Sequence, residues 1–444
     1  MDPDTPKNIR GARANALRAL EEYHRNPRPI MSILRESEIP SEYSDETRIH
    51  TNSLAAGVIK HLNTIDFLIA RGLGARKPSQ LDGRERSRLR LAVFECRWFG
   101  TTLEALSDEY LKDDTRMVSV VRKTIEVDIG RATQRFPEAS KLSVRHSHPS
   151  FMVETLLDNL PEDDVLELLK ANNGGRHYYI RANRFKEGHG IIPSIASELG
   201  ATIEPDADIQ GLYKVTRNID KIVGSKPFRD GNILIHDKAS VLTVHALNLK
   251  PGDTVWDSCA APGQKTQLIA EQVVPSGRVV ASERYAGRLR IAKERSNLLE
   301  PANVEWLHAD ASKSPVRNVR KILIDAPCSS TGTLNSHPYY KWRLNKQTLL
   351  GIMSVQNKIL DGIIQRFLDR PGTEIVYATC SVLPHEGESQ IDSVLNRHKI
   401  ELLDPGVPGS KGYPGFECSK NVRRLFPHKH ATSGFFIARF RIID

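Results

Sequence analysis

The first third of the chain has the apolar spacing of amphipathic helices. Apolar side chains recur every three to four residues around Leu17 and Leu20, over 54–65 and over 84–99, with no β-alternation between them. Prolines at positions 27, 29 and 40 predict a long break after the first helix. We therefore expect residues 1–143 to form an all-α domain, with a linker-like stretch over 136–149.

The next hundred residues mix two periodicities. Residues 154–172 predict a helix interrupted near Pro161, whereas 178–181 and 233–235 predict short strands. The run 176–186 (RHYYIRANRFK) interleaves basic and aromatic side chains, which suits single-stranded nucleic acid because cations bind phosphates and rings stack on bases. An ordinary edge strand with a solvated face explains the run equally well. We expect a small α+β domain over 144–240.

From residue 241 onward, short apolar runs alternate with helical stretches. The predicted strands are 254–257, 278–281, 303–307, 321–325 and 374–378. This alternation predicts an α/β fold with a parallel, doubly wound sheet, so residues 241–444 should form a Rossmann-like domain. Such sheets bind ligands outside the carboxyl ends of their strands.

Composition narrows the class of partner. A chain of 444 residues is too long to fold around one ordinary hydrophobic core, so several domains are expected. The formal net charge of +9 favours an anionic partner such as nucleic acid, although a modest excess of positive charge is also explained by solubility alone. The five cysteines include no Cys-x-x-Cys pair, which argues against a zinc site and for a reducing compartment. No signal core or membrane-length apolar run is present. We expect a cytoplasmic monomer, or a nuclear one if the cell has a nucleus, without metal or membrane partners.

The loop after the first strand of the doubly wound part predicts a cofactor site. The run 258–266 (SCAAPGQKT) follows that strand and opens an apolar helix, so its small residues and the helix N-terminus can approach a ligand closely. Glu283 ends the next strand, where it would meet a ribose diol, and Asp310 ends the third, where it could reach an adenine amino group. Either acid alone is explained by helix capping. The three strand ends together predict an adenosine-containing cofactor.

Two cysteines follow two further strands. Cys328 lies in the run 325–329 (DAPCS) and Cys380 in the run 377–381 (YATCS), each after an apolar stretch. Both thiols and Asp325 should therefore face the ligand crevice. A thiolate whose pKa is lowered by a neighbour is a strong nucleophile for an electron-poor carbon. Two buried structural thiols are the alternative interpretation.

These runs resemble the signatures of the RNA cytosine-5 methyltransferases, the RsmB/NSUN family. The cofactor loop, the run 325–332 (DAPCSSTG), the run 379–381 (TCS) followed by Glu386 and Glu388, and the closing strand 434–438 (GFFIA) occur in the family's order. The runs 147–150 (SHPS) and 179–183 (YIRAN) resemble the start of its RNA-contacting domain. The N-terminal helices loosely resemble the NusB-like domain of the ribosomal RNA subgroup. The sequence departs from the usual pattern at Gln264, Glu283, Asn335, Ser336 and Ser433.

The resemblance implies a reaction and a set of roles. It implies methyl transfer from S-adenosylmethionine to carbon 5 of a cytosine in RNA, with Cys380 attacking carbon 6 and Cys328 assisting product release. Asp325 is expected to hold the base and border the cofactor, and Lys265 to add positive potential near the thiols. The expected cofactor-binding residues are Cys259, Ala260, Ala261, Pro262, Gly263, Gln264, Lys265, Glu283, Asp310 and Asp325. The residues expected to hold the RNA strand are Arg181, Asn183 and Lys186, with a further basic cluster at His428, Lys429 and His430.

Several alternatives stay open at this point. DNA cytosine-5 methyltransferases attack with a Pro-Cys cysteine, which would nominate Cys328 as the nucleophile. A non-catalytic RNA-binding or ribosome assembly factor could keep the fold, although the intact thiols and loop argue against it. Exocyclic-amine methyltransferases usually have Pro-Pro-Tyr or Pro-Pro-Phe where this chain has Ala-Pro-Cys. The NusB-like resemblance favours 16S ribosomal RNA as the substrate, with transfer RNA next.

Overall fold

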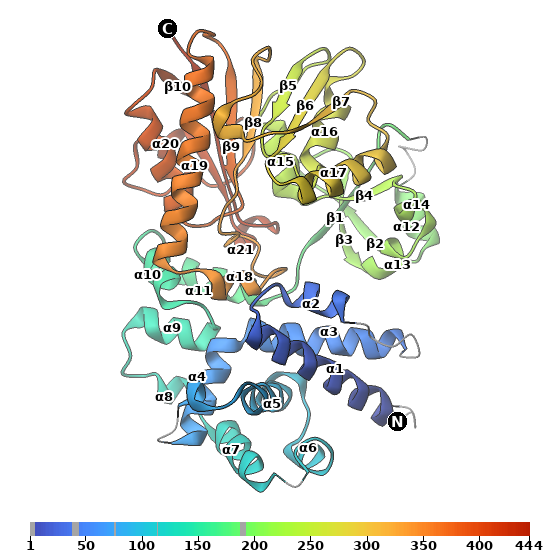
Figure 1. Ribbon diagram of the computed structural model, residues 1–444, viewed down its shortest axis with the longest axis vertical. Coiled ribbons are helices and arrows are strands. Elements are labelled where there is room, and N and C mark those ends of the chain that lie inside the picture. Colours follow the sequence, from blue (N-terminus) through green and yellow to red (C-terminus); the bar gives the residue numbers. More distant parts are fainter. Residues whose placement is uncertain (1–4, 38–43, 75–76, 113, 187–191) are drawn as a thin grey trace. The chain divides into compact units, whose positions relative to one another are not determined.

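The chain divides into two compact units in a computed structural model that describes residues 5–37, 44–74, 77–112, 114–186 and 192–444 (Figure 1). The first unit comprises residues 1–173 and 334–345, and the second comprises 174–333 and 346–444. This division differs from the predicted domains 1–143, 144–240 and 241–444. The two predicted boundaries fall inside helices α9 (Glu138–His146) and α15 (Lys238–His245).

The first unit is helical throughout its described residues, as the spacing of apolar residues predicts. Its α-helices before α9 are α1 (Thr5–Arg25), α2 (Ile30–Glu36), α3 (Asp45–Lys60), α4 (Leu62–Leu73), α5 (Gly83–Phe94), α6 (Leu103–Glu109), α7 (Thr115–Glu126) and α8 (Ile129–Ala132). After α9 come α10 (Ser150–Leu157), α11 (Glu162–Asn173) and, from much later in the sequence, α18 (Tyr339–Arg343). A 3₁₀ turn, η1 (Pro78–Gln80), and a π-helical turn, η2 (Glu95–Phe99), flank α5.

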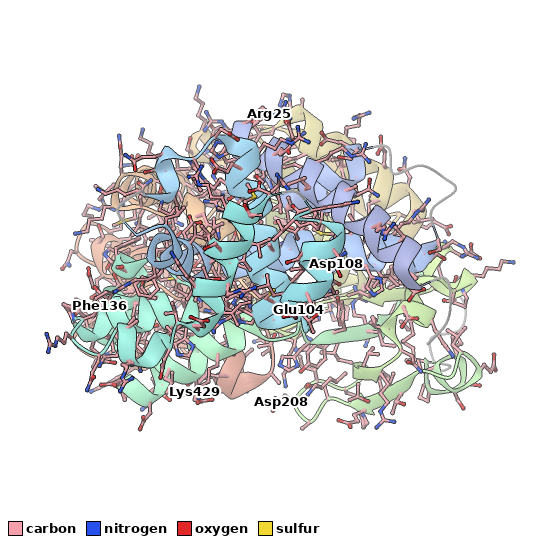
Figure 2. All side chains as sticks on the ribbon, turned by 90° about the horizontal axis from the view of Figure 1, so that it is seen from below. Arg25, Glu104, Asp108, Phe136, Asp208 and Lys429 are labelled. Atoms are coloured by element: carbon pink, nitrogen blue, oxygen red, sulfur yellow. The ribbon has the colours of Figure 1, made fainter. Side chains whose placement is uncertain are left out.

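The segment 136–149 is not the predicted linker. It contains α9, whose Leu142 and Ser143 are buried, and its prolines bound the helix instead of breaking it: Pro137 precedes α9 and Pro149 precedes α10. The ring of Phe136, labelled in Figure 2, meets the ring of Phe67 edge to face at 6.1 Å. The serine and basic residues of this segment give it the composition of a linker. Its few apolar side chains are nevertheless packed in the core, which is why the prediction was wrong.

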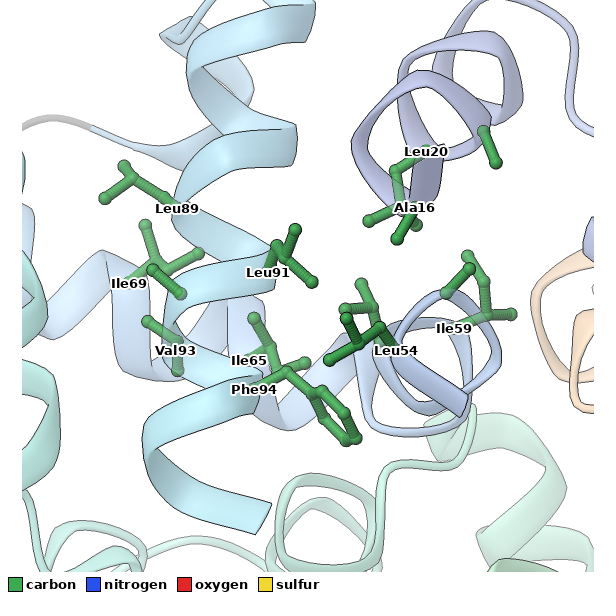
Figure 3. Packing of buried hydrophobic residues seen from close by; sticks show 14 of the residues in the cluster. Ala16, Leu20, Leu54, Ile59, Ile65, Ile69, Leu89, Leu91, Val93 and Phe94 are labelled. Atoms are coloured by element: carbon green, nitrogen blue, oxygen red, sulfur yellow. The ribbon is translucent and has the colours of Figure 1, made fainter. Parts of the chain in front are cut away.

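The core of the helical unit forms where α1, α3, α4 and α5 pack together (Figure 3). The apolar residues that they bury there are Ala16, Leu20, Leu54, Ile59, Ile65, Ile69, Leu89, Leu91, Val93 and Phe94. Gly57 of α3 packs directly beneath the ring of Phe94, because a Cβ atom at this position would lie 2.0 Å from a ring carbon. The predicted helical spacing over 54–65 and 84–99 thus corresponds to the buried faces of α3, α4 and α5.

A short helix from the second half of the chain completes the helical unit. Lys341 of α18 is fully buried, and its Nζ donates hydrogen bonds to Lys60 O at 3.1 Å, Ser147 O at 3.0 Å and Asn173 Oδ1 at 2.5 Å. These acceptors lie at the C-terminal ends of α3, α9 and α11. The negative partial charge at helix C-termini favours the charged form of this side chain, whereas burial and repulsion by Lys60 lower its pKa. Trp342 adds a hydrogen bond from Nε1 to Ile59 O at 2.7 Å.

The second unit contains a small antiparallel sheet. Its order is β2 (Thr202–Pro205), β3 (Leu212–Arg217), β1 (Tyr178–Ala182) and β4 (Ile233–Ile235). Its helices are α12 (Ile192–Glu198), α13 (Ile219–Val223) and α14 (Lys226–Arg229). Strand β1 pairs with both β3 and β4, so the basic and aromatic run 176–186 is not the edge strand that its pattern allowed.

The large sheet confirms the predicted doubly wound, Rossmann-like fold. The parallel strands are β5 (Thr254–Asp257), β6 (Arg278–Glu283), β7 (Val304–His308), β8 (Lys321–Asp325) and β9 (Glu374–Thr379). Three antiparallel strands extend it beyond β9: β12 (Phe435–Ile442), then β10 (Ile400–Leu403) and β11 (Val422–Leu425) beside β12. The helices of this part are α15, α16 (Gln264–Val273), α17 (Ala286–Leu299), α19 (Lys346–Phe367), α20 (Glu388–Leu395) and α21 (Pro427–His430).

The topology fixes where a ligand can bind. The chain runs from β5 through β6 to β7 on one side, then returns to β8 on the other side of β5. The topological switch point therefore lies between β5 and β8, at their carboxyl ends. Alternate residues of β8 pack on opposite faces, with Ile322 and Ile324 in one apolar cluster and Leu323 in the other. Among the described residues, no helix is long and apolar enough to cross a membrane.

Two glycines of α19 give a matched test of this packing. A Cβ at Gly362 would lie 2.0 Å from Ser312 O, whereas one at the exposed Gly351 would meet nothing within 4 Å. Gly362→Ala should lower the free energy of unfolding by about 3 kcal/mol because a backbone must move. Gly351→Ala should raise it by about 0.5–1 kcal/mol because glycine is a poor helix former. Urea unfolding of both variants measures the difference, and equal effects would contradict the packing.

Candidate active site

The carboxyl ends of four parallel strands carry the candidate site. Asp257, Glu283 and Asp325 are the last residues of β5, β6 and β8, and Cys380 follows β9 directly. Cys328 lies three residues beyond β8. The structure thus brings the predicted thiols and acids to one edge of one sheet, at the switch point that its topology defines.

Asp257 is a residue that sequence reasoning missed. It is buried, and its Oδ2 accepts a hydrogen bond from Thr266 Oγ1 at 2.7 Å. Its Oδ1 is also buried and has no hydrogen-bond partner among the described residues. Burial raises the pKa of Asp257 to about 7. An acid at the end of a buried strand, just before the small-residue loop, was the signal that could have found it.

The loop after β5 has the geometry of a cofactor cradle. Gly263 precedes α16 with φ 95°, a conformation that glycine adopts without strain, and a Cβ there would lie 3.3 Å from the ring of Trp306. The first backbone N–H groups of α16 have no partner within their helix, so an anionic group can bind there. Gln264 donates a hydrogen bond from Nε2 to Ile235 O at 3.1 Å. This side chain therefore ties the loop to β4.

The two acids predicted to hold the cofactor both have local partners. Glu283 is 3% exposed and accepts a hydrogen bond from Tyr285 N at 3.0 Å. Asp310 caps the turn η3 (Ala311–Lys313), accepting from Ser312 N at 3.0 Å and Ser312 Oγ at 2.7 Å. Each acid thus stabilises the backbone after its strand and remains at the ligand edge of the sheet.

Lys265 and Asp325 form an ion pair across the switch point. Lys265 Nζ lies 2.7 Å from Asp325 Oδ2, and its side chain is 13% exposed. Burial lowers the pKa of Lys265, but attraction to Asp325 outweighs it, so the pKa is raised overall and the ammonium stays charged. Nζ also lies 5.2 Å from the centre of the Phe435 ring. This places a fixed positive charge beside the thiol loops.

The two thiols touch. Cys328 Sγ lies 3.1 Å from Cys380 Sγ, and both residues are partly exposed. The hydrogen bond from Cys328 lowers the pKa of Cys380 despite burial, with smaller contributions from Ser330 and Lys265. The same hydrogen bond, together with burial and the charge of Glu386, raises the pKa of Cys328. This asymmetry favours a thiolate at Cys380 and a protonated thiol at Cys328.

The other cysteines of this unit are in structural surroundings. Burial raises the pKa of Cys259 and of Cys418. Cys418 packs in the apolar cluster of the sheet, and Cys259 borders it. Neither has the partner that lowers the pKa of Cys380. Of the residues that the structure describes, no group of three or more histidine, cysteine or acidic side chains could hold a metal ion.

Arg181 and Asn183, two of the residues expected to hold RNA, both have partners within the protein, and their RNA contacts stay predictions. Arg181 is buried, pairs with Glu271 at 2.6 Å and donates from Nε to His236 Nδ1 at 3.0 Å. Asn183 is buried and donates to Gly231 O at 3.0 Å and to Leu299 O at 3.1 Å. Both side chains therefore fasten the small sheet to the Rossmann-like part of the same unit.

The remaining basic candidates lie nearer the surface. Lys186 Nζ lies 3.0 Å from Glu300 Oε1, with 15% of its side chain exposed. In the cluster 428–430, Lys429 of α21 is exposed, and Figure 2 labels it. The RNA contacts of Lys186 and of this cluster stay predictions.

Comparison with known proteins identifies the domains. Residues 244–441 match the family described as 16S rRNA methyltransferase RsmB/F, and residues 10–112 match the NusB family. The chain is 26% identical over 429 residues to ribosomal RNA small subunit methyltransferase B of Escherichia coli O157:H7, covering 93% of this chain and 97% of that protein. It is 29% identical over 303 residues to the protein of the same name from Vibrio cholerae, covering 66% and 65%.

Mammalian relatives match over a smaller share of their length. A 28S rRNA (cytosine-C(5))-methyltransferase of Mus musculus is 27% identical over 312 residues, which is 68% of this chain but 39% of that protein. Among solved structures, PH0851 superposes with a TM-score of 0.77 at 26% identity, covering 97% of this chain and 98% of its own. A methyltransferase homologue from Pyrococcus horikoshii has a TM-score of 0.61 at 26% identity, covering 69% and 99%.

The fold and the site define a Rossmann-like methyltransferase domain in a chain that also carries a NusB-type helical domain. The methyltransferase domain matches the RsmB/F family over residues 244–441, and the N-terminal helices match the NusB family over residues 10–112. This confirms the resemblance seen in the signature runs, including the weaker resemblance of the N-terminal helices.

The buried Asp257 predicts a pH-dependent stability difference. Its pKa rises from 3.8 to about 7 on folding, so its contribution to stability is fully present below about pH 4 and is lost as the pH rises to about 7. Asp257→Asn removes this loss. The variant's free energy of unfolding relative to the native protein should increase by about 2–3 kcal/mol between pH 5 and pH 8. Chemical unfolding across this range measures it, and a flat difference would contradict the raised pKa.

The thiol pair predicts selective alkylation. Iodoacetamide should modify Cys380 before Cys328, because the thiolate is the reactive form. Cys328→Ala removes the hydrogen-bond donor and should move the pH profile of Cys380 alkylation to higher pH, whereas Cys328→Ser keeps a donor and should restore most of it. Peptide mass spectrometry follows each site. Identical profiles for the two variants would contradict the hydrogen bond as the cause.

Proposed function

We propose that this protein transfers a methyl group from S-adenosylmethionine to carbon 5 of a cytosine in ribosomal RNA. The observation that carries the proposal is the pair of touching thiols at the switch-point edge, with pKa values shifted in opposite directions. A nucleophilic thiolate next to a protonated thiol suits a reaction that needs one sulfur to add to the base and another group to accept a proton later.

The cofactor loop supports S-adenosylmethionine as the donor. The orphan Oδ1 of Asp257 is an acceptor suited to the α-ammonium group, and the N-terminus of α16 suits the carboxylate. Glu283, the last residue of β6, would hold the ribose diol, and Asp310, two residues after β7, would hold the adenine amino group. When bound, S-adenosylmethionine supplies an electrophilic methyl group.

Cys380 prepares the base for methylation. Its thiolate adds to carbon 6 of the cytosine, forming a carbon–sulfur bond, and the electron pair of the 5,6 double bond shifts into the ring and makes carbon 5 nucleophilic. Asp325 can accept a hydrogen bond from the base edge while Lys265 balances its charge at 2.7 Å. Carbon 5 then takes the methyl group and carries both it and its original proton.

Cys328 then completes the reaction. Once Cys380 is bonded to carbon 6, it no longer accepts the hydrogen bond that is the largest cause of the raised pKa of Cys328. The pKa of Cys328 therefore falls at the stage when a base is needed. The Cys328 thiol gives its proton to solvent, and the resulting thiolate, directly or through a water molecule, takes the proton from carbon 5. The electron pair of that C–H bond restores the double bond and expels the Cys380 thiolate.

The relatives favour ribosomal RNA as the substrate. Those from E. coli and V. cholerae are named for the small ribosomal subunit, and the mouse relative for 28S rRNA. The NusB-type domain adds a second surface for RNA. The formal charge of +9 and the exposed Lys429 suit a phosphate backbone. The target base leaves its stack to reach thiols that are only partly exposed.

A trapping experiment tests the division of roles between the thiols. Cys328→Ala should accumulate a covalent protein–RNA adduct in the presence of S-adenosylmethionine, because Cys380 adds but is not expelled. Cys380→Ala should form none, and Cys96→Ala is the control because Cys96 belongs to the helical unit and burial raises its pKa. Denaturing gels with labelled RNA show the adduct. An adduct with Cys380→Ala instead would reverse the two roles.

Methylation itself identifies the RNA. Incorporation of a labelled methyl group into small-subunit ribosomal RNA, and loss of one bisulfite-resistant cytosine in cells lacking the protein, are the expected results. Incorporation into transfer RNA would change the substrate and keep the chemistry. No incorporation into any RNA class would favour a non-catalytic RNA-binding or assembly factor.

A further inference from the structure

One buried carboxylate touches both cysteine loops. Glu386 ends the turn η4 (Pro384–Glu386) and is fully buried. Its Oε1 accepts a hydrogen bond from Ser329 N at 2.8 Å. Its Oε2 accepts from Ser381 Oγ at 2.5 Å and also from Ser329 Oγ. Ser329 directly follows Cys328, and Ser381 directly follows Cys380.

We propose that Glu386 is a positioning residue that sets the spacing of the two thiols by bridging the residues that follow them. The proposal rests on the function proposed above for the thiols. Among the described residues, no other carboxylate forms hydrogen bonds with both Ser329 and Ser381. The Sγ–Sγ distance of 3.1 Å is held at one end by the pairing of β8 with β9 and at the other by this bridge.

A second contact strengthens the bridge on the Cys328 side. Gln356 of α19 donates from Nε2 to Glu386 Oε1 at 3.1 Å and to Pro327 O at 3.0 Å. The residues on both sides of Cys328 are therefore held by one amide and one carboxylate. The main chain of Glu386 is fixed as well, because its carbonyl accepts a hydrogen bond from Tyr377 OH at 2.9 Å.

The surroundings of Glu386 differ from those of the next buried acid. Glu388, two residues on, forms an ion pair with the buried Arg424 and accepts a hydrogen bond from Tyr413 N at 2.9 Å. The recorded partners of Glu386 are neutral donors. Burying a carboxylate is costly, and several hydrogen bonds to neutral donors offset that cost without cancelling the charge. The remaining negative charge also helps Cys328 keep its proton.

The chemistry explains why the spacing matters. A hydrogen bond between two sulfur atoms exists over a narrow range of distance, and both thiols must also reach adjacent atoms of one pyrimidine ring. A displacement of about 1 Å in a positioned group is enough to cost about a hundredfold in rate. A bridge between the loops therefore controls both the charge state of Cys380 and the geometry of its attack.

Glu386→Gln tests the proposal with little change in shape. The amide turns one acceptor oxygen into a donor that faces the Ser329 or Ser381 donors. We expect kcat for methyl transfer to fall about tenfold to hundredfold, with the dissociation constant for S-adenosylmethionine unchanged within about twofold. Glu374→Gln is the matched control, because Glu374 bonds Lys321 at 2.7 Å and Arg439 at 2.6 Å at the opposite end of β8 and β9.

A readout independent of methylation measures the spacing directly. Phenylarsine oxide bonds two nearby thiols through one arsenic atom and releases water, and mass spectrometry of the full-length protein detects the bridge between Cys328 and Cys380. Glu386→Gln should slow bridging strongly, whereas Glu374→Gln should bridge at the native rate. Equal bridging rates in the two variants would overturn the proposal, whether or not the native protein methylates the RNA supplied.

Two further variants decide the case if Glu386→Gln does not fold. Ser329→Ala and Ser381→Ala each remove one hydroxyl of the bridge. Each should slow bridging by phenylarsine oxide, and the double variant should slow it further. Native bridging rates in a folded double variant would refute the positioning role. If the native protein transfers no methyl group to RNA although phenylarsine oxide still bridges its two thiols, the proposed function is refuted and the positioning role stands.

Discussion

The parallel pairing of β8 with β9 is the constraint on which the candidate active site depends. It sets Asp325 opposite Ala378, so the loops that leave the two strands start side by side and carry Cys328 and Cys380 to 3.1 Å. At that distance the sulfur atoms share a hydrogen bond, and their pKa values belong to the pair more than to either residue. The opposite shifts of the two pKa values thus follow from the contact between the two loops, which the strand pairing brings about.

Three acids around this pair are stabilised in three different ways. Asp325 is neutralised by Lys265, which keeps its charge from raising the pKa of Cys380 unopposed. Asp257 is buried with one free oxygen and has a raised pKa. Glu386 is surrounded by neutral donors. The carboxylate group thus forms an ion pair in Asp325, keeps one oxygen without a hydrogen bond in Asp257 and joins two loops in Glu386, depending on what surrounds it.

The sequence predicts the parts of this structure that are decided locally. The strands β5 to β9 are found because apolar runs between loops are typical of buried parallel strands, and the thiols are found because they follow such runs. Strands β2 and β3 were missed because they carry several polar side chains, and β2 buries none of its residues and β3 only two. Long-range partners were also missed. Arg181 has the charge expected of an RNA contact, but the sequence did not reveal its partner Glu271, ninety positions away.

The short helix α18 has a consequence for how the protein is made. Lys341 and Trp342 satisfy the carbonyl groups at the end of α3, yet the ribosome adds them some 280 residues later. During synthesis the last carbonyl groups of α3 therefore lack these two partners until the β8 strand and the Cys328 loop have been translated. When α18 is synthesised, about half of the methyltransferase domain has therefore already been translated. The NusB-type helices are thus first in sequence, but one of their C-terminal ends gains partners from a segment that is synthesised much later.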